Sequence, residues 1–294
     1  MNGRLAAVLA LAAAPVLAQQ QDFSKVEIKA EKVAEGVYML TGAGGNIGLS
    51  VGKDGAYVID DQFAPLTDKI VAAIRTVTPD PVRFVINTHW HGDHTGGNEN
   101  MGKAGALLVA HENVRRRMSV EQLNALGRKT PASPEGALPV VTFTDSVTFH
   151  WNGDEIRVTH VAPAHTDGDA YVHFVKADVV HMGDLLFNGS YPFIDTGSGG
   201  RIDGVIAAAD QVLAATGEKT RFIPGHGPLA TRADLQSYRD TLQALRDRIA
   251  RLKSEGKSRD EVIAAKPTAD HDAKWGTGFM KGDTFTGLAY DSLK

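Results

Sequence analysis

The sequence contains no cysteine, and this absence removes several kinds of chemistry. No disulfide can stabilise the fold, and the chain has neither a thiolate nucleophile nor a thiolate metal ligand. A metal site in this chain must therefore use imidazole nitrogens and carboxylate oxygens. The residues available for it are 11 histidines and 35 aspartates and glutamates.

The sequence also lacks a long basic block and, after its first 18 residues, a long hydrophobic run. The formal net charge of −4 argues against a nucleic-acid groove, which needs clustered lysine and arginine. An apolar fraction of 43% and a charged fraction of 22% are typical of a soluble globular protein. The length of 294 residues allows one large domain or two small ones.

Residues 1–18 have the features of a secretory signal peptide. Arg4 gives the positive start, residues 5–14 form an apolar run too short to cross a bilayer, and small residues precede Ala18. We expect cleavage after Ala18, export to the bacterial periplasm or beyond, and no stable membrane insertion of the mature chain. A retained N-terminal anchor is the alternative, which the lack of a second apolar span disfavours.

The stretch Thr-His-Trp-His-Gly-Asp-His at residues 88–94 organises the rest of the chain. Three histidines and one aspartate fall within six residues, between an apolar β-branched run and a glycine-rich segment. This order predicts a buried strand, a loop crowded with metal ligands and the start of a helix. A surface histidine cluster without a role is the alternative interpretation. Zinc suits such a mixture of imidazole and carboxylate ligands.

The motif His-x-His-x-Asp-His that begins at His89 resembles the signature of the metallo-β-lactamase-fold hydrolases. That family has three further ligands downstream, in the order histidine, aspartate or cysteine, and histidine. The matching local contexts in this chain surround His165, Asp184 and His226. The resemblance covers nearly the whole mature chain, residues 19–294, which we expect to be a single domain with two similar halves.

The resemblance implies two Zn²⁺ ions, although other divalent metals are possible, and it divides the ligands between them. One ion would be held by His89, His91 and His165. The other would be held by Asp93, His94 and His226. Asp184 would bridge the two ions.

The resemblance also implies a hydrolase acting on a small molecule, in which a metal-bridging hydroxide attacks a carbonyl carbon. Asp93 is the expected catalytic residue, because it would both bind a metal and orient the hydroxide or pass a proton. We expect opening of a cyclic amide, a β-lactam first, with modest or promiscuous activity.

Two departures keep a lactone or thioester hydrolase open as the alternative. Asp184 replaces the cysteine of the commonest lactamase subclass, and Phe187 stands where that subclass has a lysine. An aspartate in this context is similar to the glyoxalase II branch, which cleaves thioesters. A persulfide dioxygenase is a further alternative, which a metal analysis that finds one iron per chain would support. A non-catalytic metal-binding protein is another, which an open, water-bearing site disfavours.

Hydrophobic periodicity predicts strands and helices in both halves, with a seam at residues 130–139. This order fits the family's α/β (α+β) architecture, a four-layer αββα sandwich with the metal ligands at one edge. Strands are predicted at 26–28, 37–41, 47–51, 56–60, 82–87, 107–110, 140–143, 146–150, 155–161, 170–175, 179–182 and 221–223. Helices are predicted at 65–77, 113–127, 202–216 and 231–255, and two short helical pieces are expected to close the chain.

Residues 190–200 predict a mobile loop over the metals, because this segment is long and rich in glycine. The candidate substrate contacts are Trp90, Asn188, Tyr191 and Phe193. A plain surface loop and a packing role for Trp90 are the alternatives.

Two further side chains could support the ligands from behind. Asp60 ends a strand where the family often has a supporting carboxylate, although a turn or helix-capping role fits equally. His181 lies three residues before Asp184, whereas the five other histidines outside the ligand set are expected to be core or surface residues.

Overall fold

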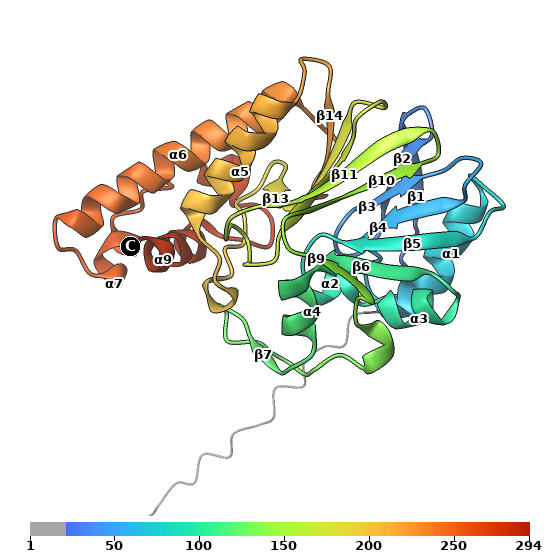
Figure 1. Cartoon of the computed structure of the whole chain (residues 1–294). Helices are drawn as coiled ribbons and strands as arrows, with labels where there is room; N and C mark the ends of the chain where they lie inside the picture. Colours follow the sequence, from blue (N-terminus) through green and yellow to red (C-terminus); the bar gives the residue numbers. More distant parts are fainter. Residues whose placement is uncertain (1–21) are drawn as a thin grey trace, which may run out of the picture.

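The computed structural model describes residues 22–294, so the expected signal peptide and its cleavage site lie outside the described residues. The chain forms a four-layer αββα sandwich, with two packed sheets between outer layers of helices (Figure 1). The predicted fold class is therefore confirmed.

The first sheet contains seven strands in the order β1-β2-β3-β4-β5-β6-β9. Strands β1 to β4 form an antiparallel meander, whereas β4, β5, β6 and β9 run parallel to one another. Parallel neighbours need crossover connections, and α1 (Thr67–Arg75) and α3 (Asn98–Lys103) lie in two of them. The strands are β1 (Lys29–Ala34), β2 (Val37–Thr41), β3 (Ile47–Ser50), β4 (Ala56–Ile59), β5 (Val82–Asn87), β6 (Leu107–His111) and β9 (Val141–Phe143).

The second sheet contains six strands in the order β10-β11-β12-β13-β14-β15. Only β13 and β14 are parallel neighbours, and the chain crosses between them through α5. The strands are β10 (Ser146–Trp151), β11 (Asp154–His160), β12 (Ala170–Phe174), β13 (Val179–Phe187), β14 (Arg221–His226) and β15 (Ala230–Thr231).

Helices cover the outer face of each sheet (Figure 1). On the first half they are η1 (Ala64–Leu66), α1 (Thr67–Arg75), α2 (Gly92–Thr95), α3 (Asn98–Lys103), α4 (Glu112–Met118) and η2 (Glu135–Ala137). On the second half they are η3 (Thr196–Ser198), α5 (Ile202–Ala215), α6 (Arg232–Ser254), α7 (Arg259–Ala264), α8 (Asp272–Trp275) and α9 (Gly282–Ser292). None of the helices in residues 22–294 is long and apolar enough to cross a membrane.

Four apolar clusters lie in residues 22–294, and the three largest hold the layers together. Tyr57 and Phe174 belong to the core between the two sheets. Ile70 of α1 packs with residues of the first sheet in the second core. The third core joins the second sheet to α5, α6 and α9, with Leu242 and Phe285 fully buried. Burial of both sheet faces in this way fixes the strand ends that carry the site.

Several predicted elements differ from the structure at their boundaries. The strands predicted at 179–182 and 221–223 extend to Phe187 and His226. The first strand begins at Lys29 rather than at residue 26. The helix predicted for residues 113–127 ends at Met118, and a hairpin of β7 (Gln122–Leu123) and β8 (Lys129–Thr130) follows it. Gly127 has a φ of +74° in the hairpin turn, a conformation that no α-helix contains.

The change from the first sheet to the second falls later than the predicted seam. The strand at Val141–Phe143 pairs with β6 and so completes the first sheet. The second sheet begins at Ser146. Residues 130–139 therefore lie within the first half.

Candidate metal centre and its cavity

The seven residues predicted as metal ligands come together at one edge of the sandwich. The ligand loop follows β5, and His165 lies in the loop between β11 and β12. Asp184 lies within β13 and His226 ends β14, whereas the sequence predicted both just beyond a strand. Both halves of the chain therefore contribute to one site.

The first group contains His89, His91, His165 and Asp184. His91 Nδ1 lies 3.1 Å from His89 Nε2 and 2.8 Å from His165 Nε2. Asp184 Oδ2 lies 3.8 Å from His89 Nε2 and 3.4 Å from His165 Nε2. A tetrahedral zinc ion with bonds of about 2.0 Å has ligand-to-ligand edges of about 3.3 Å. The four atoms therefore have the spacing of ligands around one small ion.

The second group contains Asp93, His94 and His226. Asp93 Oδ2 lies 3.6 Å from His94 Nε2 and 3.4 Å from His226 Nε2. Asp184 reaches this group with its other oxygen, Oδ1, which lies 3.1 Å from His94 Nε2 and 3.4 Å from His226 Nε2. Asp184 thus presents one oxygen to each group, as a bridging ligand must.

Two buried atoms at the site indicate that the protein alone does not complete it. His94 Nε2 and Asp184 Oδ1 are buried, and although the two atoms lie 3.1 Å apart, neither forms a hydrogen bond of good geometry within residues 22–294. Leaving such groups unsatisfied is costly, so each one requires an explanation. A cation between the ligands would satisfy both atoms, and the donor set of imidazoles and carboxylates fits zinc.

The two groups differ in the pKa values of their histidines. Burial lowers the pKa of His165 to about 4 and holds that of His89 well below its usual range. Burial also disfavours the charged form of His226, but the carboxylates of Asp184 and Asp93 outweigh it and raise the pKa to about 9. His165 and His89 are therefore neutral near pH 7, whereas His226 is protonated before a metal binds.

Each histidine of the first group is oriented by a hydrogen bond at the ring nitrogen that faces away from the other ligands. His89 Nδ1 lies 3.1 Å from Thr88 Oγ1, and His165 Nδ1 lies 2.6 Å from the carbonyl oxygen of Phe193. His91 uses Nε2, 3.0 Å from Asp195 Oδ2. The remaining ring nitrogens therefore point their lone pairs into the site.

Asp60 supports the second group. Its Oδ2 lies 2.8 Å from His94 Nδ1 and accepts a hydrogen bond from Thr88 Oγ1, while Oδ1 accepts one from the Thr88 amide. Asp60 was open to two interpretations, a carboxylate that supports the ligands and a turn or helix-capping residue. Its contact with His94 agrees with the first. His181 contacts backbone instead, since its Nε2 lies 3.1 Å from the Asn46 carbonyl oxygen and its Nδ1 accepts from the Gly183 amide.

Two glycines explain how Asp184 fits between the groups. Gly183 has a φ of +51°, and a Cβ there would lie 2.6 Å from the Thr88 side chain. A Cβ on Gly225 would collide with Asp184 Oδ1. Glycine at position 225 therefore leaves room for the carboxylate, and glycine at position 183 leaves room for Thr88 and permits the positive φ.

A cavity of about 660 Å³ opens over the ligand groups. It is lined by Phe63, Trp90, His91, Gly92, Asp93, Asn124, Leu126, Arg128, Thr130, Asp184, Phe187, Ser190, Tyr191, Phe193, His226, Phe279 and Met280. Aromatic and aliphatic side chains make up much of this wall, as in most small-molecule sites.

The predicted substrate contacts are placed differently from one another. Trp90 and Phe193 line the cavity, and Trp90 Nε1 also donates to Ser198 Oγ. Tyr191 borders it but is fully buried, and its hydroxyl donates to Asp272 Oδ1 at 2.9 Å. Asn188 is not among the lining residues, and its amide donates to the Pro228 carbonyl oxygen.

The segment at residues 190–200 is packed into the protein, and its residues Ser190, Tyr191 and Phe193 line the cavity over the ligand groups. The mobility expected of this segment stays a prediction. Most of its side chains are buried, including Ile194 and Asp195. The β7–β8 hairpin and residues 279–280 form a further part of the cavity wall. The helix predicted for residues 113–127 leaves no place for this hairpin. Asp195 also escaped notice, because an aspartate among glycines and serines is typical of a turn.

An αββα sandwich that shares one carboxylate between two groups of ligands places this protein among the metal-dependent hydrolases. The chain belongs to the metallo-beta-lactamase superfamily, because the model of that family matches residues 40–251. The resemblance stated from the motifs is therefore confirmed.

Two curated relatives are hydroxyacylglutathione hydrolases. The protein from Erythrobacter litoralis is 31% identical over 108 residues, which are 36% of this chain and 35% of the relative. The protein from Pelagibacter ubique is 26% identical over 149 residues, which are 49% of this chain and 52% of the relative. The chain thus spans about a third to about half of these relatives.

Solved structures share the fold at lower identity. A metallo-beta-lactamase from Pontibacter korlensis is 21% identical with a TM-score of 0.62, covering 74% of this chain and 99% of that protein. A stereoselective inverting sec-alkylsulfatase from Pseudomonas sp. is 17% identical with a TM-score of 0.69, covering 90% of this chain and 50% of that protein. At these identities the likeness concerns the fold alone.

Proposed function

We propose that the protein is a zinc hydrolase with two metal ions that opens a cyclic amide, with a β-lactam as the first substrate to test. The observation that carries this proposal is the placement of Asp184, which offers a different oxygen to each group of ligands. The imidazole and carboxylate donors, without a thiolate, suit two zinc ions.

Different residues of the chain would bind the metals, accept the proton and exclude water. His89, His91 and His165 would hold one metal, and Asp93, His94 and His226 the other. Two bound cations would supply a shared water of lowered pKa and would polarise the substrate carbonyl. Asp93 lines the cavity and is 28% exposed, so its carboxylate can orient the water and accept its proton. Trp90 and Phe193 would exclude bulk water from the reacting carbonyl.

A thioester or lactone hydrolase is the second candidate. Phe187 stacks on His226 with ring centroids 5.0 Å apart, at the position where a cation would bind a lactam carboxylate in the commonest lactamase subclass. The curated relatives are named as hydroxyacylglutathione hydrolases, which act on thioesters. Both observations favour a substrate other than a standard lactam.

Purified protein should be assayed against a lactam, a lactone and a thioester, with metal content measured on the same sample. The proposal predicts two zinc ions per chain and hydrolysis of at least one substrate, and the preferred substrate decides between the two candidates. One iron per chain, or no hydrolysis by the zinc-loaded protein, would contradict it.

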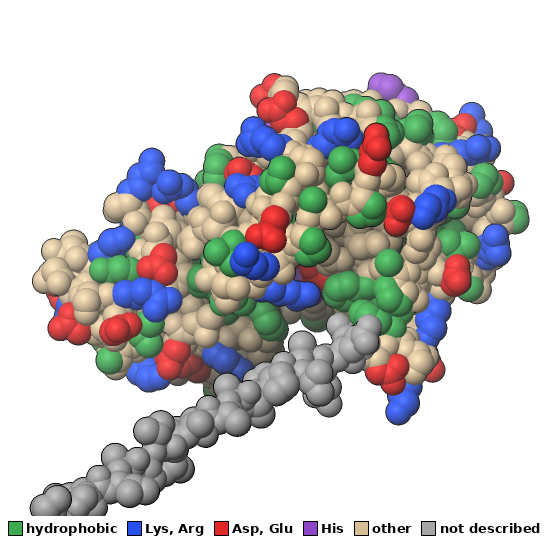
Figure 2. All heavy atoms as spheres, turned by 90° about the horizontal axis from the view of Figure 1, so that it is seen from below, with side chains coloured by type: hydrophobic (Ala, Val, Ile, Leu, Met, Phe, Trp, Pro, Cys, Tyr) green, Lys and Arg blue, Asp and Glu red, His purple; other side chains and the backbone are tan. Residues whose placement is uncertain are grey.

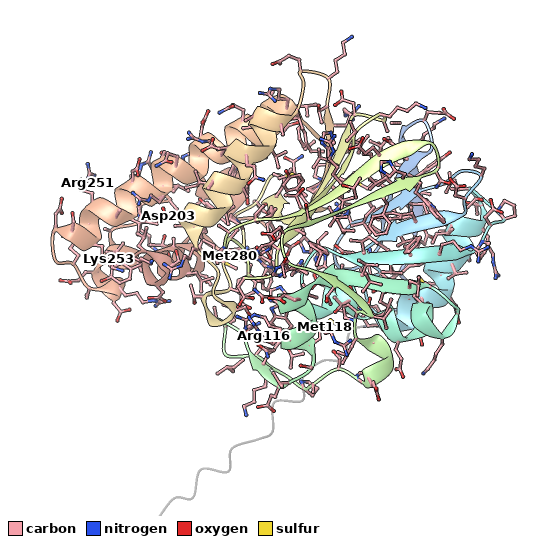
Figure 3. All side chains as sticks on the ribbon, viewed as in Figure 1. Arg116, Met118, Asp203, Arg251, Lys253 and Met280 are labelled. Atoms are coloured by element: carbon pink, nitrogen blue, oxygen red, sulfur yellow. The ribbon has the colours of Figure 1, made fainter. Side chains whose placement is uncertain are left out.

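Asp93→Ala tests the assignment of the proton-accepting group. Loss of a positioned base commonly lowers turnover about 100- to 10,000-fold. Asp203→Ala is the control, because Asp203 lies on α5 and pairs with Arg246 at the surface (Figure 3). Near-normal turnover in Asp93→Ala would remove Asp93 from the catalytic role.

We also propose export as a single mature domain that begins at Gln19. N-terminal sequencing of protein from the periplasmic fraction measures this directly. A chain that retains Met1 there would contradict cleavage.

A further inference from the structure

Arg128 is the one arginine or lysine that lines the cavity formed by residues 22–294. Arg117 forms an ion pair with Asp167 at 2.6 Å, and Arg116 approaches the same carboxylate at 4.0 Å. Arg128 has no such carboxylate partner within the described chain. A guanidinium without a partner, at the wall of a binding cavity, is suited to bind an oxyanion through two hydrogen bonds.

The hairpin that carries Arg128 is fixed to the site. Asn124 Oδ1 accepts hydrogen bonds from the amides of Leu126 and Arg128 at 3.0 Å and 2.9 Å, which closes the turn. Asp195 Oδ1 accepts one from the Ala125 amide at 2.7 Å. Asp195 also contacts His91, so the hairpin is tied to the first group of ligands. Arg128 therefore belongs to the cavity wall.

Apolar side chains stand exposed beside Arg128. Leu126 is 44% exposed and Phe279 is 75% exposed, and both line the cavity. Leu123 and Val120, near them in the chain, are 56% and 54% exposed. Figure 2, which views the molecule from below, shows hydrophobic and basic side chains side by side on this face. Grouped exposed apolar residues of this kind mark binding surfaces for apolar ligands.

We propose that the cavity takes an amphipathic anion, in which an oxyanion pairs with Arg128 and an apolar chain packs against Leu126 and Phe279. One part of this proposal rests on the proposed function, namely that the hydrolysable carbonyl lies at the ligand groups. The substrate would then be an acyl compound with a negatively charged group and a hydrophobic portion. Neutral or purely polar esters and amides would bind poorly.

Binding can be measured without turnover by calorimetric titration of the metal-loaded protein with 1-octanesulfonate. A sulfonate offers the oxyanion but no hydrolysable carbonyl. We expect Arg128→Gln to weaken this binding at least about tenfold, the scale of a charge-assisted hydrogen bond. Arg251→Gln is the matched control, because Arg251 is exposed near the C-terminal end of α6, well apart from Met280 (Figure 3). It should bind as the parent protein does.

Phe279→Ser tests the apolar part separately. In the parent protein 1-octanesulfonate should bind more tightly than methanesulfonate, and this preference should shrink in Phe279→Ser. Octanoate and octyl sulfate, each titrated into the parent protein and Arg128→Gln, then show whether a carboxylate or a sulfate is the preferred oxyanion.

The outcomes separate this inference from the proposed function. Absence of octanesulfonate binding, or equal binding by the parent protein and Arg128→Gln, overturns the anion site whatever the enzyme hydrolyses. Arg128-dependent binding together with no hydrolysis of a lactam, lactone or thioester retains the anion site and rejects the proposed function. Equal affinity for 1-octanol and 1-octanesulfonate also overturns the role of Arg128.

Discussion

Asp184 is the residue of the site that contacts both groups of ligands. It is buried, it faces four histidines, and its two oxygens point to different groups of ligands. Burial alone would raise the pKa of this carboxyl, but the histidines outweigh it and hold the pKa well below its usual value. The carboxylate is therefore negatively charged near neutral pH and can bind a cation.

Asp184→Ala should lose at least one metal per chain and most hydrolysis, because the carboxylate neutralises part of the charge of two close cations. Metal content by mass spectrometry and turnover on the same sample measure both effects. Asp203→Ala should change neither. Full metal content with full turnover in Asp184→Ala would show that Asp184 does not bridge.

Zinc binding to the second group should release a proton. His226, with a pKa of about 9, is protonated near neutral pH, and a metal ligand must lose its proton. Affinity should therefore fall as the pH drops below that value, by about tenfold per pH unit for each proton displaced. His165, with a pKa of about 4, imposes no such requirement on the first group.

Calorimetric zinc titrations in buffers of different ionisation enthalpy, from about pH 6 to about pH 8.5, count the protons released. Acidification should empty the second group first. In His226→Gln fewer protons should be released on zinc binding, and the release due to His94 should remain, because neighbouring carboxylates outweigh burial and also raise the pKa of His94. An equal fall in zinc affinity at both groups of ligands across this pH range would contradict the assignment of the proton release to the second group.

The ligand residues could be predicted from the sequence because their chemistry is local. His89, Asp93 and His94 lie within one short loop, and His165 and His226 each have a recognisable context. Arg128 and Phe279 could not be found in this way. Their role depends on which side chains from distant segments share one cavity, and the sequence contains no local signal for that.

At the scale of elements, the β7–β8 hairpin links the cavity wall to the metal centre. Its turn is closed by Asn124, and Asp195 holds it to His91 and to Ser198. The apolar spacing of Val120, Leu123 and the residues before them is compatible with a helix. The side chain of Asn124 and the positive φ of Gly127 select the hairpin instead.

Asp195→Asn should weaken metal binding by the first group, because the amide has one acceptor oxygen in place of two. Loss of such an outer contact typically costs about 10- to 100-fold in metal affinity. Hydrogen exchange at residues 124–130 should rise at the same time, because the Ala125 amide loses its charged partner. Competition with a zinc chelator and exchange mass spectrometry measure the two effects.

Ser198→Ala is the matched control for Asp195→Asn. It removes the hydroxyl between Trp90 and Asp195 but leaves both the His91 and the Ala125 contacts in place. Metal affinity and exchange at the hairpin should stay close to those of the parent protein. Equal effects of both substitutions would assign Asp195 a general structural role.

At the scale of the whole molecule, the metal centre joins the two halves of the sandwich. Four of the ligands come from the first half and three from the second, so the site exists only when both sheets are packed. The layered order could be predicted from the alternation of strands and helices. The residues at which the chain passes from the first sheet to the second could not be predicted, because the sequence of the short strand at Val141–Phe143 has no feature that assigns it to one sheet.

Tyr191 ties the C-terminal helices to the second half, and its substitution tests stability rather than substrate choice. The hydroxyl donates to Asp272, and the ring stacks on Phe285 with centroids 4.9 Å apart. Tyr191→Phe should lower the free energy of unfolding by about 1–2 kcal/mol and leave the Michaelis constant unchanged. Chemical denaturation and steady-state kinetics measure these effects.

Tyr38→Phe, in β2 of the other sheet, is the control for Tyr191→Phe. A large change in the Michaelis constant with unchanged stability would return Tyr191 to the group of substrate contacts.

The carboxylate that joins the two groups of ligands has one more consequence, which concerns oxidation. A thiolate at that position could be converted by peroxide to a sulfenic, sulfinic or sulfonic acid, and the metal would then lose its thiolate ligand. Asp184 has no such reactivity, and the chain contains no cysteine that could form a mixed disulfide. The composition of the metal centre is therefore independent of thiol redox chemistry in its surroundings.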